Sequence, residues 1–179
     1  MTAHLLERRA SRPMWQLLTI FLLSFAALQW GWTLQRGSQL ESWVVEGATV
    51  HTSVALINVL TPRAGAMAQG YSVWARAGGI NVRRGCDGTE VWFLLLAALL
   101  AYPFSPKLRL VGAVAGAAYV FVINQMRLLA LFYSIRNDRA LFGEIHGLIA
   151  PLVLVACTLA FFIALLYWDR RLHAPLAPG

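Results

Sequence analysis

The chain has 179 residues, of which 59% are hydrophobic and only 13% are charged. Soluble domains carry about 45–50% apolar residues and roughly a quarter charged ones, so this composition excludes a disordered chain and argues against an ordinary soluble enzyme. The net charge is +7. Basic residues beside apolar runs set membrane orientation, so we expect the lipid bilayer, and no nucleic acid, as the partner of this charge.

Four apolar segments predict an all-α membrane protein, with a bundle of four transmembrane helices in a single domain covering residues 1–179. The expected spans are residues 14–34, 89–106, 109–133 and 146–168. A spanning helix needs about 20 apolar residues, and the first and last segments meet this length easily. The uncharged parts of the middle two are shorter, so their charged ends should lie at the membrane interface or slightly below it.

The segment 36–88 between the first two spans is expected to form an outer loop with some order. Residues 47–62 are uncharged but include polar residues such as His51. They are therefore predicted to form an amphipathic helix on the membrane or packed on the bundle, with a fifth span as the alternative. Further along, two short alternating runs joined by Gly78-Gly79 fit a β-hairpin with a two-residue turn, or else an irregular loop.

Basic residues beside the predicted spans indicate their orientation. With four spans, three basic clusters share one face of the membrane, which we expect to be the cytoplasmic face. Eight arginines lie on the outer side, several of them in the long loop, where the rule weakens. We therefore expect a multi-pass protein of the inner (cytoplasmic) membrane. The residues of the cytoplasmic clusters are Arg8, Arg9, Arg12, Lys107, Arg109, Arg170 and Arg171.

The first candidate functional residue is Cys86, which lies in the sequence Arg-Arg-Gly-Cys-Asp-Gly-Thr-Glu that ends at Glu90. Asp87, followed three residues later by Glu90, predicts a helix N-terminus with Asp87 as its N-cap. The positive end of that helix, together with Arg83 and Arg84, favours a thiolate, whereas the two carboxylates and burial oppose it. The alternative is a small cysteine buried for packing.

The second cysteine, Cys157, lies eleven residues beyond His146, or about 16 Å along a helix. A disulfide needs Cα atoms within about 7 Å of each other. If His146 and Cys86 lie at the same depth, the two cysteines cannot pair, and Cys86 is a free thiol. Two cysteines are also too few for a disulfide scaffold or a cysteine-rich metal site, and we expect no metal and no cofactor.

Arg127 is a charged residue inside a segment predicted to be helical through Tyr133. It lies 18 residues beyond Arg109, or about 27 Å of helix, which is close to the hydrocarbon thickness of a bilayer. Arg127 should therefore mark the outer boundary, with Asn124 on the same helical face. One interpretation is an arginine that snorkels to the interface. The other is a guanidinium turned into the bundle to hold an anion or a developing oxyanion.

His146 opens the last predicted span and should lie at the outer surface. Histidine is the usual general acid and base near neutral pH. The alternative is a neutral hydrogen-bonding residue at the interface, and His51 lies on the same side and competes for the catalytic role. Glu144 or Asp138 could orient the imidazole, and the sequence does not choose between them.

Cys86, Arg127 and His146 thus each occur at a span end on one predicted face of the membrane. Cysteine and histidine are the nucleophile and base of thiol acyl-transfer chemistry, and an arginine near them could stabilise the oxyanion. A nucleotide site is not indicated, because the chain lacks a glycine-rich phosphate loop. The alternatives are a non-catalytic membrane subunit and a thiol acyltransferase of the cell envelope.

These motifs resemble those of the exosortase/archaeosortase family, in its compact form. The resemblance rests on the Gly-Cys-Asp-Gly-Thr-Glu sequence around Cys86, on Asn124-Gln-Met-Arg127, and on His146 opening the last span. It implies a membrane thiol protease or transpeptidase that recognises a C-terminal sorting signal, made of a short motif, an apolar helix and a basic tail. It also implies that Cys86 is the nucleophile, Arg127 stabilises the oxyanion with Asn124 in support, and His146 is the general acid and base. Water or an acceptor amine would then resolve the thioester.

Overall fold

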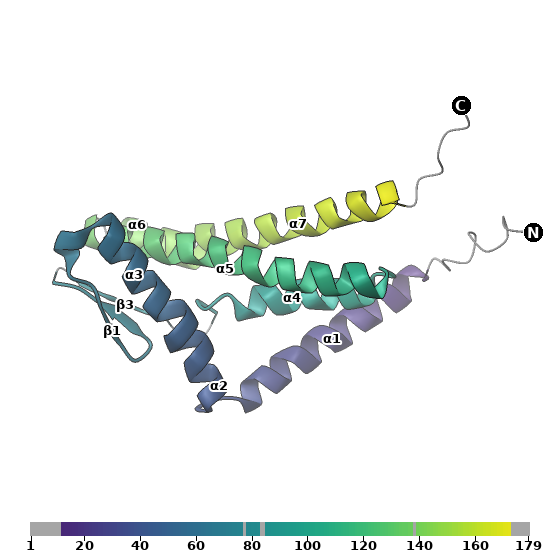
Figure 1. Ribbon diagram of the computed structural model, residues 1–179, viewed down its shortest axis with the longest axis horizontal. Coiled ribbons are helices and arrows are strands. Elements are labelled where there is room, and N and C mark those ends of the chain that lie inside the picture. Colours follow the sequence, from purple (N-terminus) through teal and green to yellow (C-terminus); the bar gives the residue numbers. More distant parts are fainter. Residues whose placement is uncertain (1–11, 77, 83–84, 138, 173–179) are drawn as a thin grey trace, which may run out of the picture.

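The computed structural model describes residues 12–76, 78–82, 85–137 and 139–172, and most of them are helical (Figure 1). The first half of the chain forms α1 (Met14–Leu34), α2 (Gln39–Ser42), the π-helix η2 (Trp43–Val50), α3 (His51–Leu60), the 3₁₀-helix η3 (Pro62–Ala64), β1 (Met67–Gln69), β2 (Ser72–Trp74) and β3 (Ile80–Asn81). The second half forms α4 (Thr89–Ala101), α5 (Pro106–Asn137), α6 (Arg139–Glu144), the π-helix η4 (Ile145–Ile149) and α7 (Ala150–Leu172).

A helical bundle makes up one half of the molecule. Its members are α1, α4, the first half of α5 and α7, and α4 is central because it packs against the other three. Among the described residues, four helices are long and apolar enough to cross a membrane, namely Met14–Leu34, Gln39–Leu60, Pro106–Arg136 and Ala140–Leu172. Three of the four predicted spans correspond to helices of this set, and the predicted span 89–106 does not. Helix α4 has only 13 residues, about 20 Å, and the helix Gln39–Leu60 takes its place in that set.

The early end of α4 has a local cause. Tyr102 precedes Pro103 and adopts an extended conformation with ψ of 140°, as expected of a residue before proline. Two arginines then donate to the carbonyls that the helix end leaves open. Arg109 Nε lies 3.1 Å from the Leu99 carbonyl oxygen, and Arg12 Nη1 lies 3.3 Å from that of Ala101. Positive charge at this end also suits the helix dipole.

Helices α4 and α5 approach each other closely because α5 has glycines at the contact. A Cβ added at Gly116 would lie 2.3 Å from Cδ2 of Leu95. A Cβ added at Gly112 would lie 3.0 Å from Cδ1 of Leu165 in α7. Interiors of proteins are close-packed, so these two glycines set the spacing of the bundle.

We call the continuous helix Gln39–Leu60 the outer arm. It begins after Gly37, whose φ of +73° allows the chain to turn away from the end of α1. Ser38 Oγ accepts a hydrogen bond from the Glu41 amide at 3.3 Å, and the Glu41 carboxylate accepts one from the Gly37 amide at 2.7 Å. The arm slants away from the bundle and packs against α5 and β1 (Figure 1). The helix predicted at 47–62 is therefore present, and it begins earlier than predicted.

Three short antiparallel strands lie beside the arm, in the order β1-β2-β3. The predicted hairpin is confirmed as β2 and β3, with Val73 opposite Ile80. Its connection is longer than the predicted two residues, because β2 ends at Trp74. Strand β1 was not predicted. It is anchored to α3 by Asn58, whose side-chain amide makes two hydrogen bonds to the Ala66 backbone at 2.8 and 2.9 Å.

The molecule has two separate apolar cores, one in the bundle and one under the arm and the sheet. The bundle core is formed by Leu95, Leu99, Phe104, Leu108 and Leu165. The outer core joins the arm, the sheet and the second half of α5, and it consists of Val45, Val50, Ile57, Ala64, Ala66, Val73, Ile80, Val82, Cys86, Leu128, Leu131 and Phe132. Cys86 is thus part of the outer core, at the point where that core meets the bundle.

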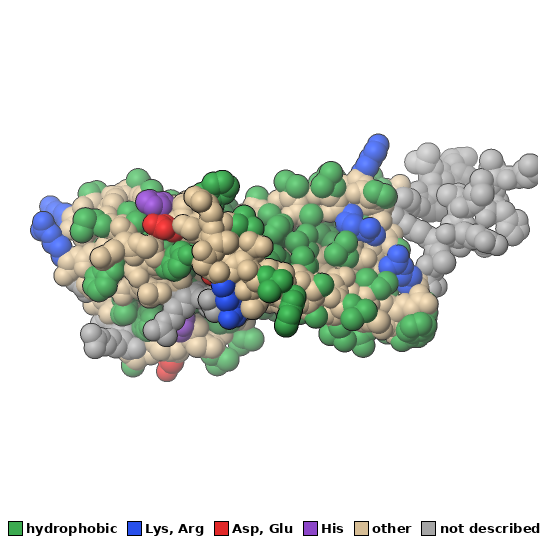
Figure 2. All heavy atoms as spheres, turned by 90° about the horizontal axis from the view of Figure 1, so that it is seen from below, with side chains coloured by type: hydrophobic (Ala, Val, Ile, Leu, Met, Phe, Trp, Pro, Cys, Tyr) green, Lys and Arg blue, Asp and Glu red, His purple; other side chains and the backbone are tan. Residues whose placement is uncertain are grey.

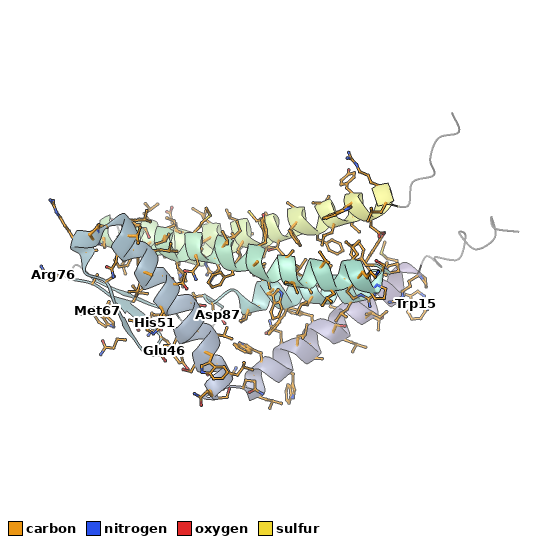
Figure 3. The ribbon with its side chains drawn as sticks, viewed as in Figure 1. Trp15, Glu46, His51, Met67, Arg76 and Asp87 are labelled. Atoms are coloured by element: carbon orange, nitrogen blue, oxygen red, sulfur yellow. The ribbon has the colours of Figure 1, made fainter. Side chains whose placement is uncertain are left out.

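The described basic residues that were predicted to be cytoplasmic lie at the bundle end of the molecule. The starts of α1 and α5 and the end of α7 lie together at one end of the molecule (Figure 1), so the described residues of the predicted cytoplasmic clusters share that end. Figure 2 shows Lys and Arg side chains at this end, next to a surface rich in hydrophobic side chains. Figure 3 places Trp15 there, with Met67 and Arg76 at the opposite end. Arg8 and Arg9 lie outside the described residues.

Candidate active site

Cys86 lies in a tight turn that connects the sheet to α4. The turn needs left-handed backbone at two positions, Gly85 with φ of +78° and Gly88 with φ of +85°, which glycine adopts readily. The prediction that Asp87 caps α4 is wrong, because Gly88 is the N-cap. The left-handed glycine directly before Thr89 leaves Asp87 outside the cap, and the Asp87 Oδ2 atom instead accepts a hydrogen bond from Thr89 Oγ1 at 2.7 Å.

Helix α5 holds this turn through two side chains, one helical turn apart. Asn124 Nδ2 donates to the carbonyl oxygen of Cys86 at 2.9 Å. Arg127 Nη1 donates to the carbonyl oxygen of Gly85, also at 2.9 Å. The expectation that both residues lie on one helical face is confirmed. The resemblance implied that Asn124 supports Arg127, and in the structure its side-chain amide holds the cysteine backbone instead.

Arg127 also reaches the sulfur atom. Its Nη2 atom lies 3.6 Å from Cys86 Sγ, and the side chain is only 9% exposed. A snorkelling arginine would extend toward water, so the structure fits the alternative in which the guanidinium turns inward. The thiol and the cation therefore form a buried pair, although 41 positions separate them in the chain.

The electrostatic surroundings raise the pKa of the Cys86 thiol above its ordinary value. Burial is the largest cause, the Arg127 guanidinium acts in the opposite direction, and the carboxylates of Asp87 and Glu90 raise the pKa further. The resting group is therefore a thiol at neutral pH. The sequence suggested that the start of the helix, Arg83 and Arg84 would favour a thiolate. In the structure it is Arg127 that lowers the pKa of the thiol, and burial in the outer core outweighs this effect. Arg83 and Arg84 lie outside the described residues.

His146 is not brought to the sulfur atom. It is exposed, and its ring stacks on that of Phe142 with centroids 5.5 Å apart and planes 4° from parallel. His146 does not begin the last helical segment, because helical structure begins at Arg139 and continues through the π-helix that contains His146. Phe142 and Ile145 pack against the outer core that includes Cys86. His146 thus lies on the outside of a helix whose inner side faces the cysteine core.

The other candidates are placed as follows. His51 is exposed on the arm, and Glu144 is exposed beside the π-helix. Asp138 lies outside the described residues. Cys86 and Cys157 are both free, which confirms that they do not pair. Within the described part of the chain, no three His, Cys, Asp or Glu side chains are grouped so that they could hold a metal ion.

Three buried polar atoms around the turn lack a hydrogen-bond partner. They are Asp87 Oδ1, Asn124 Oδ1 and Arg127 Nε. Buried polar groups are almost always hydrogen-bonded, and exceptions call for a cause such as catalysis or an absent ligand. Here two acceptors and one donor lie around a single cysteine, and a bound peptide group needs one acceptor for its N–H and a donor for its carbonyl oxygen. Sequence patterns gave no signal for this, because it depends on which atoms the fold leaves unpaired.

A cavity of about 500 Å³ adjoins the turn and is lined by Trp32, Glu41, Val45, Tyr71, Asn81, Val82 and Asp87. A smaller one of about 50 Å³ lies next to it and is lined by Gln29, Trp32, Thr33, Arg36, Glu41, Gly85, Thr89 and Glu90. Both therefore lie between the end of α1, the start of the arm and the cysteine turn. The role of Asp87 as a cavity-lining residue was not predicted, since its sequence position suggested only a helix cap.

No family model, curated protein or solved structure matches this chain. The chemistry of the site therefore has to be argued from its residues and their geometry.

Proposed function

We propose that this protein is a membrane-embedded thiol protease or transpeptidase of the exosortase type, which cleaves or transfers proteins at a C-terminal sorting signal. The observation that carries the proposal is the buried pair of Cys86 and Arg127, with Nη2 3.6 Å from Sγ. Packing alone would not require a buried guanidinium at a cysteine, because burying a charge is costly unless it is paired. A developing negative charge at the cysteine gives that guanidinium a function.

The bundle crosses the inner membrane, with the basic end in the cytoplasm. The arm and the sheet then lie on the outer side, and the cysteine turn lies where the bundle meets them. Helix α4 is shorter than the hydrocarbon core, about 20 Å against about 30 Å. The turn is therefore recessed toward the membrane, where the apolar helix of a sorting signal can present the residues that precede it.

In the first half-reaction, Cys86 attacks the carbonyl carbon of the scissile peptide bond. The thiol proton passes to His146, the S–C bond forms, and Arg127 offsets the charge on the carbonyl oxygen. The C–N bond then breaks, and the departing nitrogen takes the proton back from His146. The His146 ring is exposed and stacked on Phe142, so for this step the ring has to leave Phe142 and its helix has to turn His146 toward the cysteine. In the second half-reaction, water or an amine attacks the thioester carbon, the C–S bond breaks, and the sulfur regains a proton.

The experiment is co-expression with a candidate substrate that carries an epitope tag and a C-terminal sorting signal. Cys86→Ser should accumulate normally and abolish processing, because a hydroxyl is a far poorer nucleophile than a thiolate near neutral pH. Cys157→Ser is the matched control, since it removes the other free cysteine, and it should process normally. Equal loss in both variants would point to a structural role for the cysteines and against the proposal.

A further inference from the structure

We propose that Asp87 and the cavity beside it form a subsite for a cationic nitrogen group, an ammonium or a guanidinium, of a peptide that reacts at Cys86. The inference rests on the proposed function for its biological meaning. The binding itself is a property of the folded chain and does not require turnover.

The Asp87 carboxylate is buried, and only one of its two oxygen atoms accepts a hydrogen bond. Its side chain is only 8% exposed. Oδ2 is fixed by Thr89 Oγ1 at 2.7 Å, while Oδ1 is buried and has no hydrogen-bond partner. Burying a carboxylate without full hydrogen bonding is unfavourable, so such a group calls for a donor. The Oδ1 atom itself has almost no accessible surface, but the residue lines the cavity of about 500 Å³, so a cation there would meet the negative charge of the carboxylate group. Figure 3 shows Asp87 between the arm and the start of α4.

The cavity has the size and the lining of a small-ligand site. Its volume falls within the range of about 300–1,000 Å³ that is usual for such sites. It is large enough for an extended lysine or arginine side chain. Trp32 and Tyr71 contribute aromatic rings to its walls, and ring faces attract cations.

The described charged residues around the two cavities also favour a cation. Three are carboxylates, Glu41, Asp87 and Glu90, and one is a guanidinium, that of Arg36. The Arg127 guanidinium contacts the Gly85 carbonyl and the Cys86 sulfur, and it lines neither cavity. The cationic group at the sulfur is therefore distinct from the charged residues that line the two cavities, and Asp87 is the carboxylate next to the cysteine that lines the larger one.

Two sources of a cationic group fit this position. One is a lysine or arginine side chain next to the scissile bond of the donor peptide. The other is the acceptor amine of the second half-reaction. In that case the bound ammonium first loses a proton to water in the cavity, and its nitrogen then attacks the thioester carbon. The C–S bond breaks, and the sulfur takes up the second proton of the amine.

The test is the thermal stability of the purified full chain in detergent, with N-acetyl-lysine amide or N-acetyl-norleucine amide added at equal ionic strength. A ligand that binds only the folded state raises the unfolding midpoint in a saturable way. The lysine compound should raise the midpoint and the norleucine compound, which lacks only the ammonium, should not. Equal effects of the two compounds would overturn the proposal.

Two variants locate the effect. Asp87→Asn keeps an acceptor for Thr89 Oγ1 but removes the charge, and it should abolish the lysine-specific rise. Glu46→Gln is the matched control, because Glu46 is a carboxylate of the arm that pairs with Ser42 Oγ at 3.2 Å. It should leave the rise unchanged. A lysine-specific rise that persists in Asp87→Asn would refute the subsite. If Asp87→Asn does not fold, the comparison of the two compounds on the unaltered protein still decides.

The same variant distinguishes the two sources once a processed substrate is known. For a donor side chain, replacing the basic residue next to the scissile bond by norleucine should raise KM in the unaltered protein but not in Asp87→Asn. For an acceptor amine, added n-butylamine should divert product from acid to amide only when Asp87 is present. A lysine-specific midpoint rise without any processing would refute the proposed function and leave the subsite standing. Processing of a substrate without a lysine-specific midpoint rise would refute the subsite and leave the proposed function standing.

Discussion

Arg127 Nη2 lies 3.6 Å from Cys86 Sγ, while Nη1 of the same guanidinium donates to the carbonyl oxygen of Gly85 at 2.9 Å. One side chain thus fixes the turn that carries the cysteine and also supplies positive charge at its sulfur atom. Asn124 holds the next carbonyl along the turn. The position of the thiol is therefore set by α5, a helix distant in the sequence, rather than by the helix that follows the cysteine.

The planar shape of the Arg127 side chain should matter more than its charge. Arg127→Lys keeps a cation but cannot reach both the Gly85 carbonyl and the sulfur in a fixed fork. We expect processing to fall by about 10²–10³-fold, the usual cost of losing one oxyanion donor. The measurement is the rate of appearance of the processed substrate.

Arg136→Lys is the matched control for this substitution. Arg136 lies on the same helix, 5.4 Å from the centre of the Phe132 ring, and its replacement should have little effect on processing. If Arg127→Lys processes as fast as Arg136→Lys, the oxyanion role is excluded.

The pH dependence of Cys86 alkylation should respond to its two charged neighbours in opposite directions. Burial raises the pKa of the Cys86 thiol, so alkylation should still be increasing at pH values above the ordinary pKa of a cysteine. Arg127→Gln removes the group that lowers this pKa and should move the midpoint to higher pH. Asp87→Asn removes a group that raises it and should move the midpoint to lower pH. The assay is the alkylation rate as a function of pH in a Cys157→Ser background, and shifts in the same direction would contradict the charge arrangement.

Packing between α4 and α5 predicts a large difference between two glycines. Gly116→Ala would place a Cβ 2.3 Å from the fully buried Leu95 side chain. We expect a loss of about 1–3 kcal/mol from overpacking, seen as a lower unfolding midpoint in detergent. Gly31→Ala is the control on α1, where nothing lies within 4 Å of the added atom. It should be neutral or slightly stabilising, because alanine favours helix. Equal destabilisation by both substitutions would mean that the α4–α5 contact is not as close as described.

The two outer histidines should differ in their effect on processing. We expect His146→Ala to block turnover, because the helix that carries His146 packs on the core that contains Cys86 and the proposed mechanism uses His146 for proton transfer. A thiol reagent should still label Cys86 in this variant. His51→Ala removes an exposed histidine of the arm and should retain most activity. Western analysis of substrate processing gives the first readout, and mass spectrometry of the labelled cysteine gives the second. The reverse pattern would assign the proton-transfer role to His51.

The orientation of the outer arm gives a prediction about topology. Reporter fusions after Pro106 and after Gly179 should be cytoplasmic, and a fusion near Gly79 should be external. The arm packs on the sheet and on α5, which favours a position outside the bundle although its length and composition would allow it to cross a membrane. If the amino terminus and Gly79 are found on the same side, the arm is a fifth span.

Periodicity and length predicted the helical elements well because apolar runs are local signals. The first span coincides with α1 at Met14–Leu34, and the hairpin at β2 and β3 follows from alternation around a glycine pair. The end of α4 was missed by five residues because Pro103 ends the helix within an apolar run. The helix start at Arg139 was missed because two charged residues, Arg139 and Glu144, precede the long apolar run that begins after them.

The site was only partly visible in the sequence. Cys86, Asn124 and Arg127 are identifiable because a charged or reactive residue at the edge of an apolar run is unusual. The pairing of Asn124 with the cysteine carbonyl, and the unpaired oxygen of Asp87, depend on contacts between segments far apart in the chain. The stacking of His146 on Phe142 depends on side-chain orientation within a π-helix. No one-dimensional pattern contains this information.

The most direct measurement is detection of a covalent acyl intermediate on Cys86. The protein and a processed substrate are mixed, quenched with acid and digested, and the cysteine peptides are examined by mass spectrometry. We predict an acyl group on the Cys86 peptide that hydroxylamine removes, as expected of a thioester, and none on the Cys157 peptide. Continued processing of the substrate by Cys86→Ser, or an acyl group found on Cys157 instead, would contradict the account.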